Sequence, residues 1–332
     1  MSEAHVTYYT ISDHSFFLGT VALLNSLHVT ANPGELVVLD AGLTSSEREL
    51  LSQHATIFPA PKEIEVHPLV MKAYPSLLKP SGTVVLIDSD IVVTGSLAPV
   101  AELARKGKIC VCPAWTPEVR RRWFPEWETT LQLRSPLRRE PWVHAGFVAF
   151  STGHWPDLLE RYWEVCELVP ANEAFTSGMP FNAGDADALN ALLMSEIPQG
   201  TSALLPEGAE VFGGDIVVDD LQTLASSVDG RRTTMLHYPD RPKPWERSGW
   251  LRIGTPGYIR IMRRLLFSSD VPLRLDPSQV PLWIRPNLPG ELTLRALAVN
   301  RLIAWSVYRV PEPVRDRVRR LRRQLARKLS PA

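Results

Sequence analysis

Cysteine is scarce in this chain of 332 residues, which holds three, Cys110, Cys112 and Cys166. Three cysteines cannot build a disulfide framework, so the sequence excludes a small secreted fold stapled by disulfides. Cys110 and Cys112 stand two positions apart in an apolar stretch and therefore share one face of a predicted strand. We expect both to be buried as small hydrophobic side chains.

Long hydrophobic runs are also missing. The uncharged stretch 16–34 is interrupted by Asn25, His28, Asn32 and Pro33, which is unlike a transmembrane helix. The first twenty residues contain no Lys or Arg and no small-residue cleavage pattern, so we expect no secretory signal and a cytoplasmic location. With 45% hydrophobic and 22% charged residues, the composition excludes disordered, fibrous and multi-span membrane proteins.

The chain has no net charge, with 36 basic and 36 acidic residues, but the charge is unevenly spread. Residues 311–332 hold eight Arg or Lys against two acidic residues, so this tail is +6 and residues 1–310 are −6. An acidic body argues against a nucleic-acid binder. Val314, Val318, Leu321, Leu325 and Leu329 mark one apolar face of the tail. Segment 311–329 therefore predicts peripheral attachment to an anionic membrane, at its inner face, with a dimerising helix as the alternative.

Apolar strand patterns alternate with helical patterns along most of the chain. The predicted strands are 6–11, 35–40, 83–88, 142–151 and 233–238, and the predicted helices are 16–29, 97–106, 154–168 and 187–195. Thr44 and Glu47 form a capping box that begins another short helix. Apolar strands separated by helices indicate βαβ units and a mostly parallel sheet. Ligands bind such sheets at the carboxyl ends of the strands.

The sharpest motif, Asp88-Ser89-Asp90, stands at the end of the apolar strand 83–88. Carboxylates without a partner at the end of a buried strand lower the stability of the fold, because burial of an unpaired charge costs free energy. A divalent cation is the simplest partner, because carboxylate oxygens suit Mg²⁺ and Mn²⁺. Two solvated acids in a turn are the alternative for an isolated Asp-x-Asp.

Two further clusters carry polar side chains. Asp187 is placed to cap a helix, and Asp185 precedes that helix, free to bind a ligand. His237 ends a strand and is followed by a proline-stiffened loop that ends in Lys243. His is a competent metal ligand, and a loop Lys is a compact charge for a phosphate. Taken singly, each residue also fits a purely structural role.

Considered together, the three clusters predict a site for a diphosphate. Two carboxylates and a His can hold one metal ion, which can neutralise the charge on a departing diphosphate. Lys243 adds a second positive group. A metal ion and a lysine in one site suit a reaction that breaks the bond between a sugar's anomeric carbon and a nucleoside diphosphate.

Five segments in this order resemble glycosyltransferase family 8, a group of GT-A fold that includes glycogenin and bacterial lipopolysaccharide glycosyltransferases. They are VTYYTISDHSFFLGTVALLNSL, LIDSDIVVTGSL, VHAGFVAFSTGHW, GDADALN and HYPDRPKPW, within residues 5–250. The resemblance implies a Rossmann-like GT-A domain, predicted over residues 1–255, with a mostly parallel mixed sheet flanked by helices. The helical spacing and the basic charge near the C-terminus predict a helical basic extension over 256–332. It also implies a Mn²⁺ or Mg²⁺ ion and a nucleotide-sugar donor, usually UDP-linked. The sugar would pass to a glycan, lipid or protein acceptor with retention of anomeric configuration.

The resemblance assigns roles to single residues. Asp88 and Asp90 match the family's Asp-x-Asp metal ligands, and His237 matches its third protein ligand. Lys243 matches the lysine that contacts the diphosphate, and Asp185 matches the acid that holds the donor sugar's hydroxyls, so we expect these two to be catalytic. The residues expected to contact the donor are Thr10 and Asp13 around uridine, Lys72 near the sugar and phosphate, Asp88, Ser89, His144 and Lys243.

Three positions depart from the family pattern. His144 replaces the Asn of Asn-Ala-Gly, Ala186 replaces the Gln of Asp-Gln-Asp, and Asp240 replaces the glycine of the lysine loop. These changes bear on the donor sugar and on the retaining chemistry, and they do not touch the metal ligands. A catalytically inactive, carbohydrate-binding relative is therefore one alternative.

The segment 115–142 differs from its surroundings in composition, with four of the ten tryptophans and six arginines. Trp faces suit sugar rings and Arg suits anionic groups on a lipid or glycan. We predict that this insertion binds the acceptor, with Trp123 and Trp127 as the residues to test. A surface loop that uses its tryptophans as local core is the alternative.

A phosphohydrolase of the haloacid dehalogenase type is the rival from another class. It also needs an apolar strand that ends in Asp-x-Asp, here Asp88 as nucleophile and Asp90 as general acid and base. Its later Gly-Asp-x-x-x-Asp pattern is supplied by Gly214, Asp215 and Asp219. That class usually has Gly after the second Asp and carries the motif at the start of the chain, neither of which holds here.

Overall fold

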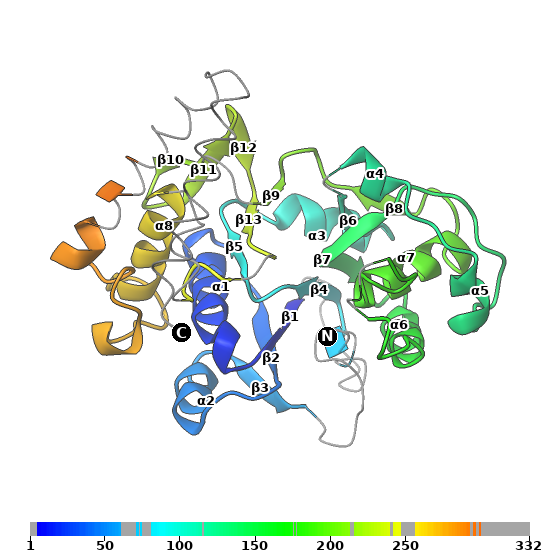
Figure 1. The fold of residues 1–332 in the computed structure, drawn as a ribbon, viewed down its shortest axis with the longest axis horizontal. Coiled ribbons are helices and arrows are strands. Elements are labelled where there is room, and N and C mark those ends of the chain that lie inside the picture. The colour runs from blue at the N-terminus through cyan, green and yellow to red at the C-terminus, as the bar shows by residue number, and fades with distance from the viewer. Residues whose placement is uncertain are drawn as a thin grey trace, which may run out of the picture.

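The computed structural model describes residues 5–60, 71–72, 74, 81–114, 116–174, 176, 178–212, 216–239, 242–246, 256–292, 295–296 and 299. Helices cover both faces of a seven-stranded sheet, which gives three layers (Figure 1). The strand order is β3–β2–β1–β4–β7–β6–β8, and β7 alone runs antiparallel to its two neighbours. The strands are β1 (Val6–Ser12), β2 (Glu35–Asp40), β3 (Thr56–Pro59), β4 (Thr83–Ile87), β6 (Ile109–Pro113), β7 (Val143–Ser151) and β8 (Ser202–Leu204).

The order of the strands reverses at β1. Strands β2 and β3 extend to one side of β1, whereas β4 lies on its other side, and both β2 and β4 are parallel to β1. Such a reversal leaves a crevice outside the carboxyl ends of the diverging strands. Asp13 follows β1 and Asp88 follows β4, so both lie at this crevice.

Side chains of the central strands alternate between two apolar layers. In β4, Val85 and Ile87 belong to one layer, and Val84 and Leu86 to the other. The first layer includes α1 (Phe17–Val29), α2 (Ser45–Ser52), α3 (Ala98–Arg105) and α8 (Pro256–Phe267), and the second includes α5 (Glu126–Thr130), α6 (Leu158–Glu167) and α7 (Asp185–Ser195). Burial on both faces explains why these strands are apolar throughout.

Two small sheets adjoin the central one. In the first, β13 (Met235–His237) pairs antiparallel with β5 (Ile91–Val93) and parallel with β9 (Glu210–Phe212). His237 is in register with Ile91, the residue that follows Asp90, so this pairing brings His237 close to Asp90. The second small sheet consists of β10 (Val217–Asp220), β11 (Ala225–Val228) and β12 (Arg231–Thr233).

The fold class predicted from the sequence is confirmed, and the local differences concern boundaries. The capping box is present, with the Glu47 N–H donating to Thr44 Oγ1 at 3.3 Å and the Thr44 N–H donating to Glu47 Oε2 at 2.9 Å. The helix predicted over 154–168 begins later, at Leu158, after a turn that contains Pro156. The strand predicted over 233–238 is divided at Thr234, since β12 and β13 belong to different sheets.

The remaining predictions concern cysteines, the insertion and the tail. All three cysteines are buried and free, as expected for Cys110 and Cys112. Segment 115–142 contains the helices α4 (Pro117–Arg120) and α5 besides irregular chain. In the part of the chain that the structure describes, none of the helices has the length and apolar character needed to span a bilayer. The basic segment 311–329 lies outside the described residues.

Candidate functional site

A cleft of about 1140 Å³ opens at the carboxyl ends of β1 and β4. One part of its wall consists of Ile11 to Asp13 and the Asp88–Asp90 turn, and another of residues 118–119 and 121–124. The sequence-predicted residues that line it are Asp13, Lys72, Asp88, Ser89, Asp90, His144, Asp185, His237 and Lys243. The fold therefore gathers nearly all of the predicted site residues from segments far apart in the chain.

The turn after β4 places the two carboxylates. The Asp88 N–H donates to the Gly146 carbonyl at 2.9 Å, and the Ile91 N–H donates to the Asp88 carbonyl at 3.1 Å. The first bond joins the end of β4 to β7, and the second closes the turn between β4 and β5. Asp90 is buried, with its side chain 5% exposed, whereas the Asp88 side chain is 26% exposed and faces the cleft.

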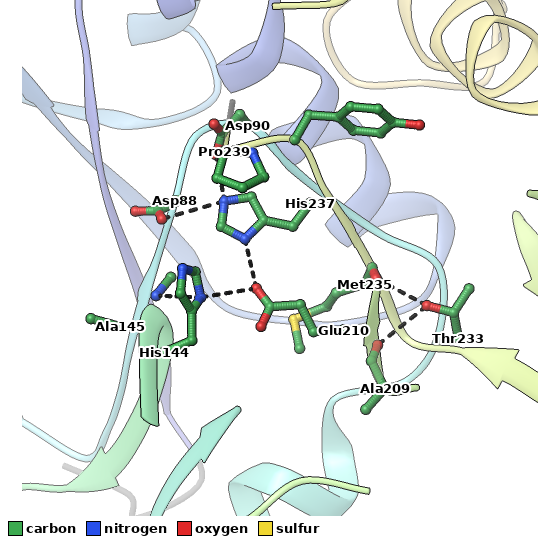
Figure 2. Close-up of polar contacts among 12 residues, drawn as sticks. Asp88, Asp90, His144, Ala145, Ala209, Glu210, Thr233, Met235, His237 and Pro239 are labelled. Carbon is green, nitrogen blue, oxygen red and sulfur yellow. Dashed lines mark hydrogen bonds and ion pairs between the residues drawn. The ribbon is translucent and has the colours of Figure 1, made fainter. Parts of the chain in front are cut away.

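His237 completes a three-residue cluster with these carboxylates (Figure 2). Its Nε2 lies 3.1 Å from Asp90 Oδ1 and 3.5 Å from Asp88 Oδ2. This nitrogen is buried and makes no hydrogen bond within the described residues. A buried nitrogen without a hydrogen bond, facing two carboxylates, suits a shared cation, and two oxygens with one imidazole suit Mn²⁺ or Mg²⁺. The donor set therefore fits the predicted divalent cation.

Nearby charges shift the pKa values of Asp90 and His237. Burial alone would raise the pKa of Asp90, but the charges of His237 and Lys243 hold it well below its usual range. Burial alone would lower the pKa of His237, but Asp90 and Glu210 raise it to about 10. A cation that binds to Nε2 must displace a proton there, so binding of the cation releases that proton.

Two buried lysines reach the same carboxylates. Lys243 Nζ lies 2.5 Å from Asp90 Oδ2 and also donates to the carbonyls of Tyr238 and Pro239. Lys72 Nζ lies 2.5 Å from Asp88 Oδ1 and 3.2 Å from Asp185 Oδ2. Burial alone would lower the pKa of Lys72, but the two carboxylates hold it above its ordinary value. Both lysines line the cleft.

The acidic cluster at α7 differs from the sequence prediction. Asp185 is the first residue of α7 rather than a residue before it, and its carboxylate faces Lys72 rather than being free. Burial raises the pKa of Asp185 more than Lys72 lowers it. Asp187 is not the N-cap, a position that Gly184 takes. Its carboxylate instead pairs with Arg122 through two contacts of 2.7 Å.

The predicted contacts to uridine are divided between the cleft and the core. Asp13 lines the cleft, where its Oδ1 caps the short helix His14–Phe16 by accepting from the Phe16 N–H at 3.1 Å. Thr10 is buried within β1, and the described lining of the cleft begins one residue later, at Ile11. The role of Thr10 as a donor contact therefore stays a prediction from the resemblance.

Tryptophans of the insertion also divide into two groups. Trp127 is fully buried in the second apolar layer, so the prediction that it binds an acceptor is wrong. Trp123 lines the cleft, and the Arg139 guanidinium lies 4.2 Å from the centroid of its ring. The insertion thus provides both local core and one wall of the cleft.

Sequence reasoning missed Glu210. Its carboxylate is buried behind His237, with Oε1 2.7 Å from His237 Nδ1 and 3.4 Å from His144 Nδ1 (Figure 2). Although burial alone would raise the pKa of Glu210, the charges and hydrogen bonds of the two imidazoles hold it well below its usual range. A carboxylate in the three-residue strand β9 stands in no motif, so no local pattern pointed to it.

Gly146 gives a test of how tightly the imidazoles are placed. A Cβ at this position would lie 2.6 Å from His144 Cε1 and 2.7 Å from His237 Cε1. We expect Gly146→Ala to push both rings aside and to weaken Mn²⁺ binding by about ten-fold or more, since groups that orient metal ligands contribute that much. Titration calorimetry measures the affinity.

Gly153→Ala is the matched control, because its added Cβ would meet only Ser151 Oγ at 3.5 Å, an ordinary contact. It should bind Mn²⁺ like the unaltered protein. Unchanged Mn²⁺ affinity in Gly146→Ala would show that neither ring limits the site.

Comparison with solved structures places the fold among glycosyltransferases. The apo structure of WbbM, a bifunctional glycosyltransferase, is similar with a TM-score of 0.53 and 16% identity, over 82% of this chain and 51% of that one. The galactosyltransferase LgtC, in complex with donor and acceptor sugar analogs, has a TM-score of 0.49 and 15% identity over 82% of this chain and 98% of its own. GlyE of Streptococcus pneumoniae has a TM-score of 0.47 and 14% identity over 74% and 57%.

The likeness to WbbM, together with the sheet order, establishes the fold, which is the GT-A fold of glycosyltransferases. The chain spans about half of WbbM. No protein-family model and no curated protein matches the chain. Membership of glycosyltransferase family 8 stays a prediction from the sequence motifs.

Proposed function

We propose that this protein is a metal-dependent glycosyltransferase of family 8 type. It moves a sugar from a UDP-linked donor to a glycan, lipid or protein acceptor, with retention of anomeric configuration. One observation carries the proposal, the convergence of Asp88, Asp90 and His237 with two lysines in the cleft at the strand-order reversal. Neutral or hydrophobic ligands would gain nothing from this concentration of charge, whereas a metal-bound diphosphate would.

Each residue has a part in that reaction. Asp88, Asp90 and His237 would hold Mn²⁺ or Mg²⁺, and the bound ion supplies positive charge beside the diphosphate. Lys243 and Lys72 stabilise the negative charge that develops on the diphosphate oxygen as the bond to the anomeric carbon breaks. Asp185 accepts hydrogen bonds from hydroxyls of the donor sugar.

The phosphohydrolase alternative has no support from the geometry. It requires Asp219 to approach Asp88 and Asp90, but Asp219 lies exposed in β10 and its carboxylate accepts from the Ser227 hydroxyl at 3.3 Å. Asp219 is also not among the described residues that line the cleft, and Asp215 lies outside the described residues. No observation favours this function over sugar transfer.

A thermal-shift screen of nucleotide sugars, each with and without Mn²⁺, tests the proposal. A specific donor should raise the melting temperature by mass action, and only with the metal present. UDP release from that donor, with water as acceptor, then separates an active enzyme from an inactive carbohydrate-binding relative. Stabilisation by no nucleotide sugar would contradict the proposed donor class.

We propose that the acceptor binds at the wall formed by residues 118–119 and 121–124. Trp123 offers an aromatic face there, and its Nε1 donates to the Arg138 carbonyl at 3.2 Å, which fixes the ring. We expect Trp123→Ala to raise the acceptor KM about five-fold, a loss typical of one aromatic contact. The donor KM should stay unchanged.

Trp155→Ala is the control in steady-state kinetics, because Trp155 is also half-buried and its Nε1 also donates to a carbonyl, that of Gly107, away from the described cleft lining. Equal acceptor KM values for the two variants would remove Trp123 from the acceptor site.

Attachment of the basic segment 311–329 to anionic lipid is part of the proposal. Each basic residue near such a surface contributes ~1 kcal/mol, which suffices for reversible binding. Flotation with vesicles that contain phosphatidylserine should recover the protein. Replacing Arg319, Arg320, Arg322 and Arg323 by Gln in the full chain should release it, and unchanged flotation would contradict membrane attachment.

A further inference from the structure

Glu210 is a buried carboxylate for which the proposed reaction has no direct use. It begins β9, next to β13, and its side chain is 2% exposed. A carboxylate in this position is costly unless its oxygens are paired. Its Oε1 lies 2.7 Å from His237 Nδ1, which satisfies the hydrogen-bond distance, and 3.4 Å from His144 Nδ1.

The two nitrogens of His237 have different surroundings (Figure 2). Nδ1 faces Glu210, which can only accept a hydrogen bond when ionised. Nε2 faces Asp88 and Asp90 on the opposite side of the ring and has no hydrogen bond within the described residues. A neutral imidazole carries one N–H and one lone pair, and the hydrogen bond at one nitrogen decides which is which.

We infer that Glu210 is a positioning residue that holds the proton of His237 on Nδ1 and thereby presents the lone pair of Nε2 to a divalent cation. The inference rests on the proposed function, because it takes the cation site at Asp88 and Asp90 as given. Partners behind a metal-bound His fix its tautomer and orientation, and their loss typically costs about 10–100-fold in metal affinity.

Packing alone does not explain the position of Glu210. The His237 ring is also held by Phe212, with ring centroids 5.3 Å apart, and by His144, with centroids 5.1 Å apart. These neighbours restrict the plane of the ring, but neither contact distinguishes Nδ1 from Nε2. The carboxylate of Glu210 makes that distinction, and the backbone of Glu210 is in register with Met235 of β13.

Two variants of the full chain separate hydrogen-bond acceptance from packing. Glu210→Gln keeps an oxygen that accepts from Nδ1, whereas Glu210→Met has similar size and no such acceptor. With Mn²⁺ alone as probe, we expect titration calorimetry to give Glu210→Gln an affinity within about three-fold of the unaltered chain. Glu210→Met should lose about 10–100-fold.

Mn²⁺ affinity of Glu210→Met equal to that of the unaltered chain would overturn the inference, and so would equal losses in both variants. Unaltered protein that binds no Mn²⁺ would overturn the proposed function as well. Binding by the unaltered chain with no effect at Glu210 would overturn the inference alone.

The tautomer can also be read in the unaltered chain, which keeps the test valid if Glu210→Met does not fold. The chain has eight histidines, so selective ¹⁵N labelling gives a simple side-chain spectrum, and His237→Gln assigns the signal. In the chain loaded with Mg²⁺, we expect His237 to carry its proton on Nδ1 and the Nε2 signal to shift on loading. A proton on Nε2 in the loaded chain would overturn the inference.

Discussion

Asp90→Ala should abolish most of the activity, with turnover about a thousand-fold lower in saturating Mn²⁺. Asp90 contributes a buried carboxylate to the proposed cation site and is also the partner of Lys243 and His237. A bound cation provides several kcal/mol of charge stabilisation, and about 4 kcal/mol corresponds to a thousand-fold in rate. Release of UDP from the donor found by thermal shift measures turnover, and calorimetry measures the accompanying loss of Mn²⁺ affinity.

Asp229→Asn provides the control for this variant. Asp229 is an exposed carboxylate in the turn between β11 and β12, away from the described cleft lining. Its replacement should leave turnover and Mn²⁺ affinity unchanged, and circular dichroism should show all three proteins folded. Near-normal turnover of Asp90→Ala in saturating Mn²⁺ would refute the assignment of the metal ligands.

Asp187→Ala should lower the free energy of unfolding by about 3–5 kcal/mol, the cost of removing one partner from a buried ion pair. The Asp187 side chain is fully buried, and that of Arg122 is 15% exposed. Asp187 also accepts hydrogen bonds from the Trp142 Nε1–H at 3.2 Å and the Ala183 N–H at 2.8 Å. Its loss removes the carboxylate that the guanidinium and these two N–H groups contact. Urea unfolding of each variant measures the change.

An exposed pair serves as the reference. Lys106 and Glu102 are 3.2 Å apart with side chains 67% and 50% exposed, so Lys106→Ala should cost about 1 kcal/mol or less. The double variant Arg122→Met with Asp187→Leu should recover part of the lost free energy of unfolding, because it removes both charges and leaves no unpaired charge in the core. Equal small losses for Asp187→Ala and Lys106→Ala would mean that the buried pair contributes no more than a surface contact.

The fold was predictable because its signals are local. Apolar runs such as Val84–Ile87 and the capping box of Thr44 and Glu47 depend on neighbours in sequence, and they mark elements whatever lies elsewhere in the chain. Helix α7 shows the limit of such signals. Its N-cap is Gly184, with no side-chain cap, so nothing in the local sequence showed that it begins at Asp185.

The candidate site was only partly predictable because its contacts join distant segments. Glu210 meets His237 across 27 positions, and Arg122 meets Asp187 across 65, so no spacing rule connects them. Thr10 shows a different limit, because it is buried in β1 whereas Ile11 and Ser12 line the cleft. Successive residues of a strand point to opposite faces, so neighbouring positions of one motif can differ in whether their side chains reach a ligand cleft.

The pairing of β5 with β13 brings His237 to the Asp88–Asp90 turn, although the two segments are far apart in the sequence. Lys243 and Asp90, for example, are 153 positions apart. Closing so long a loop costs entropy before any contact compensates it, which delays such contacts during folding. During translation, Asp88 and Asp90 are therefore made well before His237. In the proposed site, tight binding of the cation is therefore possible only after β13 has paired with β5.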